Sequence, residues 1–348
     1  MVKDSRQNAV GSAQESYRYS CFLSSAFCVL LTVYCLLPTA YGSSWSRQPS
    51  GTMAWLHAVY FLDHNHGWVA GSNGTLLRTI DGGASWTRVA IPRDDFRDVY
   101  FSNENVGWLL AQRDLLKLKT NERSSYLLTT NDGGVTWRRV FLNTADVNVR
   151  FARMLFIDAQ HGWVFGETGV VFATSDGGAH WIPQRSATKH LLLGGAFASY
   201  RGFIAGAGAT MMQSDDAGAT WRLTVLHSSG TARLNAVSAF ENSAWAVGEA
   251  GLIFATKDGG RSWFSQGSDV NVDLSDVKFI DAREGWAVGA QGAVLHTSDG
   301  GAHWTIDPIS ISHALERIFA VDRGHVWVVG FGGTILKLGE TSAPRLKS

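Results

Sequence analysis

One eight-residue phrase occurs six times in this chain of 348 residues. It runs Ser or Thr, any residue, Asp, any residue, Gly, two further residues and Trp. The copies occupy residues 79–86, 130–137, 174–181, 214–221, 256–263 and 297–304. Such a period means that one supersecondary unit is copied around or along an axis, which constrains the fold more than any local signal does.

A second phrase, of the form Gly-Trp-x-Val-Gly, marks every unit. Its aromatic position is held by Trp68, Trp108, Trp163, Phe203, Trp245, Trp286 and Trp327. Successive positions are 40, 55, 40, 42, 41 and 41 residues apart. The chain therefore has seven units against six Asp phrases, and the longest step indicates an insertion at about 112–125 in the second unit.

Each unit contains four short strand-like runs bounded by turn residues. One alternating run precedes the Gly-Trp phrase, the phrase itself is the second, a run after a Gly turn is the third, and the last follows the Trp of the Asp phrase. Gly is abundant at 38 residues, Trp numbers 14 and Pro only 6. Four antiparallel strands repeated about every 40 residues predict an all-β fold, a seven-bladed β-propeller.

The seventh unit ends at residues 333–338 with no Asp phrase after it. Residues 42–47 (GSSWSR) resemble the end of an Asp phrase, such as residues 83–88 (GASWTR). We therefore expect the strand near Trp45 to pair with the strand near Ile335, so that one blade is built from both ends and the ring has no free edges. The propeller is expected to span 43–340, with a short tail at 341–348.

The N-terminal segment has the features of a targeting sequence. Residues 1–20 are polar, residues 21–37 are mostly apolar, and the small residues Ala40 and Gly42 favour cleavage after Gly42. An uncleaved anchor helix is the alternative; either way we expect export to a periplasm, a thylakoid lumen or the cell surface. All three cysteines lie in the apolar run, without a lipid-attachment pattern, so residues 43–348 hold no cysteine for a disulfide or a metal.

Composition excludes several classes of function. Lys plus Arg and Asp plus Glu each number 30, so no overall field attracts nucleic acid. The glycines recur with the blade period and no helix follows them, which indicates no phosphate-binding loop, cofactor or small-molecule substrate. His57 lies at the opposite end of its strand from His64 and His66, so we expect no metal site. We expect a monomer.

The Asp phrase is predicted to be structural. Its Asp can accept hydrogen bonds from its own turn, its Gly residues supply positive φ, and its Trp can fold over the turn and between blades. Chemistry at six equivalent peripheral places would make little sense. These residues are Asp81, Asp132, Asp176, Asp216, Asp258, Asp299, Trp86, Trp137, Trp181, Trp221, Trp263 and Trp304.

Four phrases in the sixth unit carry a family resemblance: residues 277–281 (VKFID), 285–289 (GWAVG), 292–297 (GAVLHT) and 299–304 (DGGAHW). In combination they resemble the photosystem II stability and assembly factor family of seven-bladed propellers with Asp-box, or BNR-like, repeats. The resemblance extends over 43–340. It implies an exported, non-enzymatic assembly factor that binds a precursor of a reaction-centre membrane subunit on the lumenal side of the thylakoid through an arginine-rich face.

A partner-binding face is expected where the first strands of the blades begin, because these strands line a propeller's channel. Basic side chains at those positions and in the insertion are Arg97, Arg150, Arg153, Arg233, Arg317, Arg113, Lys117 and Lys119. Arginine can hold a carboxylate of a protein segment by paired hydrogen bonds. The alternative interpretation is that these are solvated loop charges.

Three functions are compared. The first is an exported scaffold that binds a segment of a membrane protein, and the second is a general periplasmic or cell-surface interaction module without a photosynthetic role. The third is an Asp-box glycoside hydrolase such as a sialidase, which needs paired carboxylates across a cleft. Only Asp98 and Asp276 are acidic among the expected channel-rim positions, and the chain has no Arg-Ile-Pro motif, so the sequence favours a binding protein over an enzyme.

Overall fold

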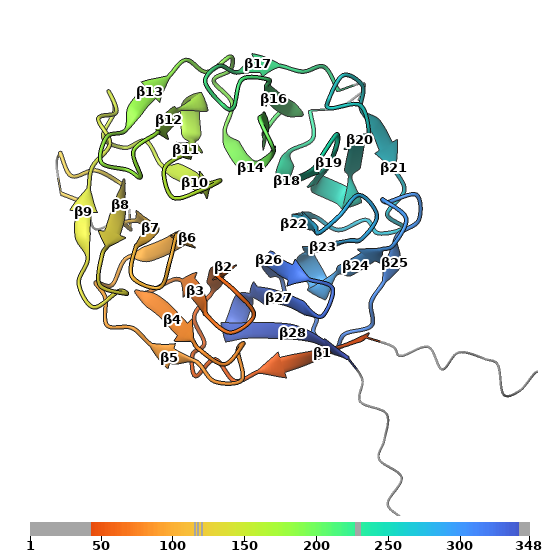
Figure 1. The fold of residues 1–348 in the computed structure, drawn as a ribbon, viewed down its shortest axis with the longest axis horizontal. Coiled ribbons are helices and arrows are strands. Elements are labelled where there is room, and N and C mark those ends of the chain that lie inside the picture. The colour runs from red at the N-terminus through yellow and green to blue at the C-terminus, as the bar shows by residue number, and fades with distance from the viewer. Residues whose placement is uncertain (1–42, 115, 117, 120, 227–230, 341–348) are drawn as a thin grey trace, which may run out of the picture. The chain divides into compact units, whose positions relative to one another are not determined.

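Seven four-stranded antiparallel sheets follow one another around a central channel (Figure 1). The structure is a computed structural model that describes residues 43–340 except 115, 117, 120 and 227–230. The expected signal peptide or anchor at 1–42 and the expected tail at 341–348 lie outside the described residues. Within the described part of the chain, no helix is long and apolar enough to cross a membrane. The prediction of an all-β, seven-bladed propeller is confirmed.

The blades are numbered in chain order, and each takes its strands from the channel outward. Blade 1 consists of β2 (Leu56–Phe61), β3 (Gly67–Gly71), β4 (Thr75–Thr79) and β5 (Thr87–Arg88). Blade 2 consists of β6 (Asp95–Phe101), β7 (Gly107–Gln112), β8 (Ser125–Thr130) and β9 (Arg138–Val140). Blade 3 consists of β10 (Phe151–Phe156), β11 (Gly162–Gly166), β12 (Val171–Thr174) and β13 (Ile182–Gln184). Blades 4 and 5 consist of β14 (Leu192–Ala198), β15 (Arg201–Gly206), β16 (Thr210–Ser214) and β17 (Arg222–Leu223); and β18 (Leu234–Phe240), β19 (Ser243–Gly248), β20 (Ile253–Thr256) and β21 (Phe264–Gln266). Blades 6 and 7 consist of β22 (Leu274–Phe279), β23 (Gly285–Gly289), β24 (Val294–Thr297) and β25 (Thr305–Ile306); and β26 (Leu315–Asp322), β27 (His325–Gly330), β28 (Thr334–Glu340) and β1 (Ser43–Gln48).

Blade 7 is built from both ends of the propeller. β1 lies antiparallel to β28, with Trp45 opposite Leu338 and Gln48 opposite Ile335 (Figure 1). The indole Nε1 of Trp45 also donates to Asp307 Oδ2 of blade 6 at 2.9 Å. The pairing confirms the prediction that the strand near Trp45 closes the ring.

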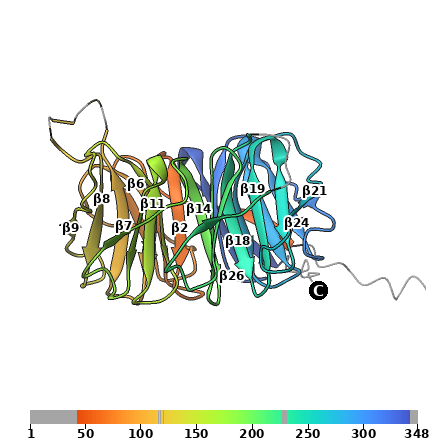
Figure 2. The same cartoon turned by 90° about the horizontal axis from the view of Figure 1, so that it is seen from above.

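In blades 3, 5, 6 and 7, whose second-to-third-strand connections are fully described, a single-turn 3-10 segment joins the two strands: η2 (Glu167–Gly169), η3 (Glu249–Gly251), η4 (Ala290–Gly292) and η5 (Phe331–Gly333). They lie on the face where the first strands begin. Figure 2 views the ring edge-on, with the strands running from one face to the other. The turns of the Asp phrases and of the first hairpin in each blade lie on the opposite face.

Neighbouring blades are joined by the Trp of the Gly-Trp phrase on the second strand. At five junctions its ring stacks on a Phe near the end of the next blade's first strand. The centroid separations are 3.5 Å for Trp327–Phe61, 3.8 Å for Trp68–Phe101, 6.0 Å for Trp108–Phe156, 4.4 Å for Trp163–Phe197 and 3.5 Å for Trp245–Phe279. The Trp327 Nε1 also donates to Gly82 O across the junction of blades 7 and 1. The Trp of the Asp phrase also reaches the preceding blade, as the sequence suggested: Trp221 Nε1 donates to Gln184 Oε1 of blade 3 at 3.0 Å, and the Trp181 ring lies edge-on 5.9 Å from Trp108 of blade 2. Within its own blade, Trp86 packs edge-on against Phe61.

Where a Gly precedes this aromatic residue, a Phe on the first strand of the same blade leaves no room for a side chain. A Cβ at Gly67 would lie 2.5 Å from the Phe61 ring, which pairs with it across the first hairpin. In blade 5 the position of the Phe is taken by Ala239, and its cross-strand partner is Ala244 rather than Gly. The two positions therefore vary together because one volume is shared between them.

Each Asp phrase is a hydrogen-bonded turn. In the first, Thr79 Oγ1 accepts from Gly83 N at 2.9 Å and donates to Asp81 Oδ1, which also accepts from Ser85 N at 2.9 Å. These bonds recur in all six copies. Hydrogen bonds from Ser85 and then Thr79 lower the pKa of Asp81 to about 2. Gly82 and Gly83 have φ of 66° and 90°, values that favour Gly, so the observed bonds agree with a structural role for the phrase.

Candidate functional site

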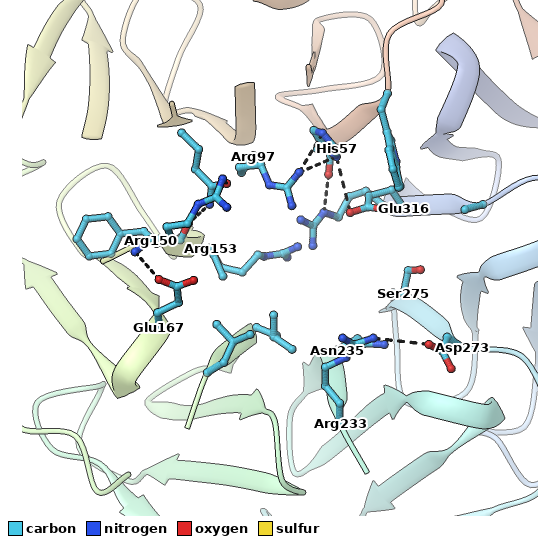
Figure 3. Close-up of a pocket in the computed structure, with 18 of the residues that line it drawn as sticks. His57, Arg97, Arg150, Arg153, Glu167, Arg233, Asn235, Asp273, Ser275 and Glu316 are labelled. Atoms are coloured by element: carbon cyan, nitrogen blue, oxygen red, sulfur yellow. Dashed lines mark hydrogen bonds and ion pairs between the residues drawn. The ribbon is translucent and has the colours of Figure 1, made fainter. Parts of the chain in front are cut away.

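A cavity of about 510 Å³ opens at the mouth of the channel where the first strands begin (Figure 3). Five of the basic residues expected from the sequence line it: Arg97, Arg150, Arg153, Arg233 and Arg317. They come from blades 2, 3, 5 and 7, so only the closed ring brings them together. This cavity and its five arginines form what we call the basic mouth.

One side of the basic mouth holds a cluster around His57. Arg97 Nη1 lies 3.0 Å from His57 Nε2, and His57 Nδ1 lies 3.7 Å from Glu316 Oε1 (Figure 3). Arg317 donates to the His57 carbonyl at 3.3 Å. Burial alone would raise the pKa of Glu316, but the hydrogen bond and charge of His57, with Arg97, hold it below its usual value.

A second pair of arginines leaves hydrogen-bonding capacity unused. Arg150 donates to Gln112 Oε1 at 2.9 Å, while its backbone N–H donates to Glu167. Arg150 Nε and Arg153 Nη1 are buried and have no hydrogen-bond partner among the described residues. Buried guanidinium donors without partners are costly, so these side chains would gain hydrogen bonds by turning toward an anionic group that enters the cavity.

Arg233 forms the opposite side of the mouth. It donates to Asn235 Oδ1 at 2.8 Å and lies 3.6 Å from both Glu249 and Asp273 (Figure 3). Its side chain is 42% exposed, so it can reorient toward a ligand with little loss. Five arginines and three carboxylates, those of Glu167, Asp273 and Glu316, line the cavity. With histidine neutral, the lining therefore carries a net positive charge.

The floor of the basic mouth consists of two ion pairs. Arg153 Nε lies 3.4 Å from Asp98 Oδ2, and Arg317 Nε lies 3.9 Å from Asp276 Oδ2. Asp98 also accepts from Met154 N, and Asp276 accepts from Ile318 N at 3.0 Å, so each acid joins two neighbouring blades. Asp276 was expected at the rim; the structure buries it in the channel wall.

Burial raises the pKa of both carboxyl groups in this floor. Desolvation raises the pKa of Asp98 although Arg153 opposes the rise. Desolvation likewise raises the pKa of Asp276 to about 6, against the charge of Arg153 and the bond from Ile318. Desolvation of these two buried carboxylates therefore outweighs the charge of Arg153, which acts on both, even though Arg317 lies 3.9 Å from Asp276.

The other end of the channel is aromatic. Arg153 and Arg317 also border a second cavity of about 510 Å³, which is lined by residues that include Tyr60, Tyr100 and Phe319. Tyr60 packs edge-on against Tyr100 and Phe319, with centroids 5.3 and 5.2 Å apart. The channel is therefore asymmetric: a basic mouth and an aromatic mouth are separated by buried ion pairs.

Two residues that were expected from the insertion, Arg113 and Lys119, do not join the basic mouth. Arg113 lies 3.8 Å from Glu122 and above the Tyr126 ring, and neither Arg113 nor Lys119 lines the cavity. Lys117 lies outside the described residues. The expectation that only Asp98 and Asp276 supply acid at the rim was also wrong, because Glu167, Asp273 and Glu316 line the cavity.

Sequence reasoning missed Gln112, Asn235 and Glu316 of the basic mouth, although they stand at or next to positions that the blade repeat marks. Glu316 precedes Arg317 by one residue and Asn235 lies two after Arg233, so a wider window around each first strand would have found both. Gln112 ends a second strand, and it enters the cavity because β7 is one residue longer than β3. The assignment of the basic side chains to a partner remains a prediction.

The family model described as photosynthesis system II assembly factor YCF48 matches residues 37–144, 94–189, 184–269 and 265–341. The chain is 31% identical over 149 residues to the photosystem II assembly lipoprotein Ycf48 of Synechococcus sp. (strain CC9902), a match that covers 42% of this chain and 41% of that protein. It is 24% identical over 303 residues to the protein of the same description from Picosynechococcus sp., covering 74% of this chain and 88% of the relative. The photosystem II stability/assembly factor HCF136 of Arabidopsis thaliana, described as chloroplastic, is 23% identical over 281 residues, covering 64% and 70%.

Solved structures show the same fold. YCF48 from Cyanidioschyzon merolae superposes with a TM-score of 0.69 at 20% identity, covering 86% of this chain and all of that one. A structure described as YCF48 bound to D1 peptide gives a TM-score of 0.69 at 20% identity, covering 85% and 94%. At this identity the superpositions establish the architecture; the site is argued from its own side chains.

Proposed function

The chain belongs to the photosystem II assembly factor YCF48 family, and from that premise we propose that it is an exported, non-enzymatic scaffold that binds a segment of a membrane protein. The segment is a peptide of the photosystem II subunit D1 or of a D1-like precursor, as in the related complex described as YCF48 bound to D1 peptide. The basic mouth is the binding site. The single observation that supports it most directly is the pair of buried, unpartnered guanidinium nitrogens at Arg150 and Arg153.

The dimensions of the basic mouth suit a chain segment. A cavity of about 510 Å³ holds a few residues of an extended peptide, and its walls combine arginines with the apolar side chains of Leu191 and Leu193. Carboxylate groups of the segment, including a free C-terminus, would receive paired hydrogen bonds from Arg150 and Arg153.

The carboxylates of the site support a binding role over hydrolysis. Glu167 accepts from the Arg150 backbone, Asp273 accepts from Ala250 N, and Glu316 contacts His57. Glycoside hydrolysis needs two carboxylates free to act on opposite sides of a substrate bond. Here the acids that line the cavity position basic groups instead.

Export is part of the proposal. The relatives carry the descriptions lipoprotein and chloroplastic, and the present chain has a polar, then apolar, then small-residue N-terminal pattern. We propose that residues 1–42 direct export and that residues 43–340 act outside the compartment of synthesis. Fractionation of cells expressing the tagged chain tests this: the tagged protein should be protected from added protease until the outer or thylakoid membrane is opened.

Peptide binding tests the function. Overlapping peptides that tile D1, each with a free or an amidated C-terminus, are titrated into the full-length chain and followed by fluorescence anisotropy. Substituting Arg150→Gln and Arg233→Gln should weaken the best peptide at least about tenfold, a loss of about 1.4 kcal/mol. The control Arg222→Gln changes an exposed arginine on the outer strand β17 and should leave affinity unchanged.

If no D1 peptide binds, the photosynthetic role is wrong and the general interaction module becomes the better proposal. If a peptide binds but the mouth variants bind it as well as the parent chain, the site is wrong. Turnover of chromogenic glycosides that disappears in Asp276→Asn would overturn the non-enzymatic part of the proposal.

A further inference from the structure

A cluster of three metal-ligating side chains lies on the face opposite the basic mouth. His64 Nε2 is 2.8 Å from Asp322 Oδ2, and His325 Nδ1 is 2.8 Å from Asp322 Oδ1. The two imidazole rings stack with centroids 4.0 Å apart and an angle of 11°. The three ligand atoms all lie within 4.8 Å of one another.

Two turns that are distant in sequence build this cluster. His64 lies in the turn between β2 and β3 of blade 1, while Asp322 ends β26 and His325 begins β27 of blade 7. The blade 7 turn is ordered by a bond from Gly324 N to Asp322 Oδ1 at 2.8 Å. The blade 1 turn is held to its Asp phrase by a bond from Gly82 N to Asn65 O at 3.0 Å. The cluster therefore rests on two ordered hairpins and spans the junction of blades 7 and 1.

Comparison with the other blades sets this cluster apart from a routine turn. An Asp followed three residues later by a bonded His also occurs at 63–66 in blade 1 and at 158–161 in blade 3. In the blade 1 copy, Glu104 of blade 2 approaches His66 Nε2 at 3.9 Å. Among the described residues, however, only the blade 7 copy forms a group in which all three ligand atoms lie within 4.8 Å of one another. That third ligand is His64, which follows the Asp of its own turn; the equivalent residue is Glu104 in blade 2 and Ala159 in blade 3, so a histidine at this position is particular to blade 1 among these turns.

Two imidazoles and one carboxylate are the ligand set of open zinc sites, which complete a tetrahedral shell with water. We propose that His64, Asp322 and His325 bind one Zn²⁺ ion across the junction of blades 7 and 1. The ion takes the place of the ring N–H contacts with the carboxylate, and the two stacked rings turn away from parallel so that both nitrogens face the ion. His64 and Asp322 are about half exposed, so the ion can enter from solvent and a fourth position remains open.

Zn²⁺ bound at this site would stabilise the closed ring. Blade 7 is the blade completed by β1, and its junction with blade 1 joins residues from opposite ends of the propeller. A metal that binds the folded ring and not the separated hairpins stabilises the closed state by mass action. This inference is independent of the basic mouth, which lies on the other face.

The test uses the purified full-length chain after removal of metal with a chelator. Zn²⁺ is titrated against a chromogenic chelator of known affinity, and thermal unfolding is followed with and without Zn²⁺. We expect one tight site, a rise in melting temperature on addition of Zn²⁺, and at least a tenfold loss of affinity in His64→Ala and in His325→Ala. The matched control His161→Ala removes a histidine from the same type of turn in blade 3 and should bind Zn²⁺ like the parent chain.

Measurements without metal separate binding from folding. His64 is exposed, so in the presence of chelator the His64→Ala variant should have the same melting temperature as the parent chain. Co²⁺ provides a second readout, since a tetrahedral site gives intense visible absorption that His64→Ala should abolish. Absence of a tight site in the parent chain, or equal affinities in the parent, His64→Ala and His325→Ala proteins, would overturn the proposal.

Discussion

Arg153 Nε lies 3.4 Å from Asp98 Oδ2, and both side chains are largely withdrawn from solvent in the channel wall. Arg153 comes from blade 3 and Asp98 from blade 2, so this pair joins two blades and forms part of the floor of the basic mouth. It therefore links ligand binding to stability. An arginine at the basic mouth cannot be regarded as a free surface charge solely because it lines the cavity.

The substitution Arg153→Gln should destabilise the protein by about 3 kcal/mol near pH 8, because it leaves the Asp98 carboxylate buried without its cation. The cost should shrink at pH 5, since burial raises the pKa of Asp98 and a protonated carboxyl needs no counter-ion. Denaturant unfolding at the two pH values measures this. Arg222→Gln, on an exposed outer strand, should cost less than about 0.5 kcal/mol at either pH. Equal costs for Arg153→Gln at both pH values would contradict the assignment.

Asp276 should make the protein less stable as pH rises from about 4 to about 7. Its pKa is raised to about 6 by burial, so the folded state keeps a proton that the unfolded state has already released above pH 4. The stabilising contribution of the Asp276 carboxyl is fully present below its pKa in the unfolded state and is lost as pH rises through its pKa in the folded state. Melting curves of the parent chain and of Asp276→Asn, which can still accept from Ile318 N, should therefore converge or cross as pH rises. A constant offset between the parent chain and Asp276→Asn would show that this carboxyl does not titrate in the window.

Gly67 and Phe61 should behave as a coupled pair. Gly67→Ala places a Cβ against the Phe61 ring and should cost about 1–3 kcal/mol. Phe61→Ala should cost about 3–5 kcal/mol, because the ring also stacks on Trp327. The double substitution recreates the Ala–Ala pair found in blade 5, so it should cost clearly less than the sum of the two single changes. Strict additivity in a double-mutant cycle would mean that the two positions do not share volume.

A substitution at Thr256 tests how much the hydrogen bonds of the Asp phrase stabilise the protein, without changing the charge of the phrase. Its buried hydroxyl accepts from Gly260 N at 2.9 Å, and Thr256→Val keeps the shape while removing that acceptor. We expect a loss of about 1–3 kcal/mol from the unsatisfied backbone donor. Thr87→Val, at an exposed position on β5, is the matched control and should be nearly neutral. A neutral Thr256→Val would argue that water replaces the lost bond.

The basic mouth shows how far sequence reasoning reached. Arg97, Arg150, Arg153, Arg233 and Arg317 stand near the starts of first strands, and the blade repeat places those starts around one mouth. The sequence did not show that Arg153 and Arg317 are also paired with buried acids, so charge reversal at either position would lower stability as well as binding. Arg113 and Lys119 were grouped with the mouth on topology alone, but Arg113 instead contacts Glu122 and Tyr126.

The sequence alone determined the number of blades, the strand order within each blade and the closing role of the strand at Trp45, since these follow from a local period and from turn chemistry. Only the tertiary structure decided which side chains meet: Arg153 with Asp98, Trp327 with Phe61, and His64 with Asp322. These contacts cross blade junctions, and the last two join opposite ends of the propeller. The physical reason is that a repeat specifies equivalent positions, whereas the contacts between non-equivalent residues exist only once the ring has closed and brought its blades side by side.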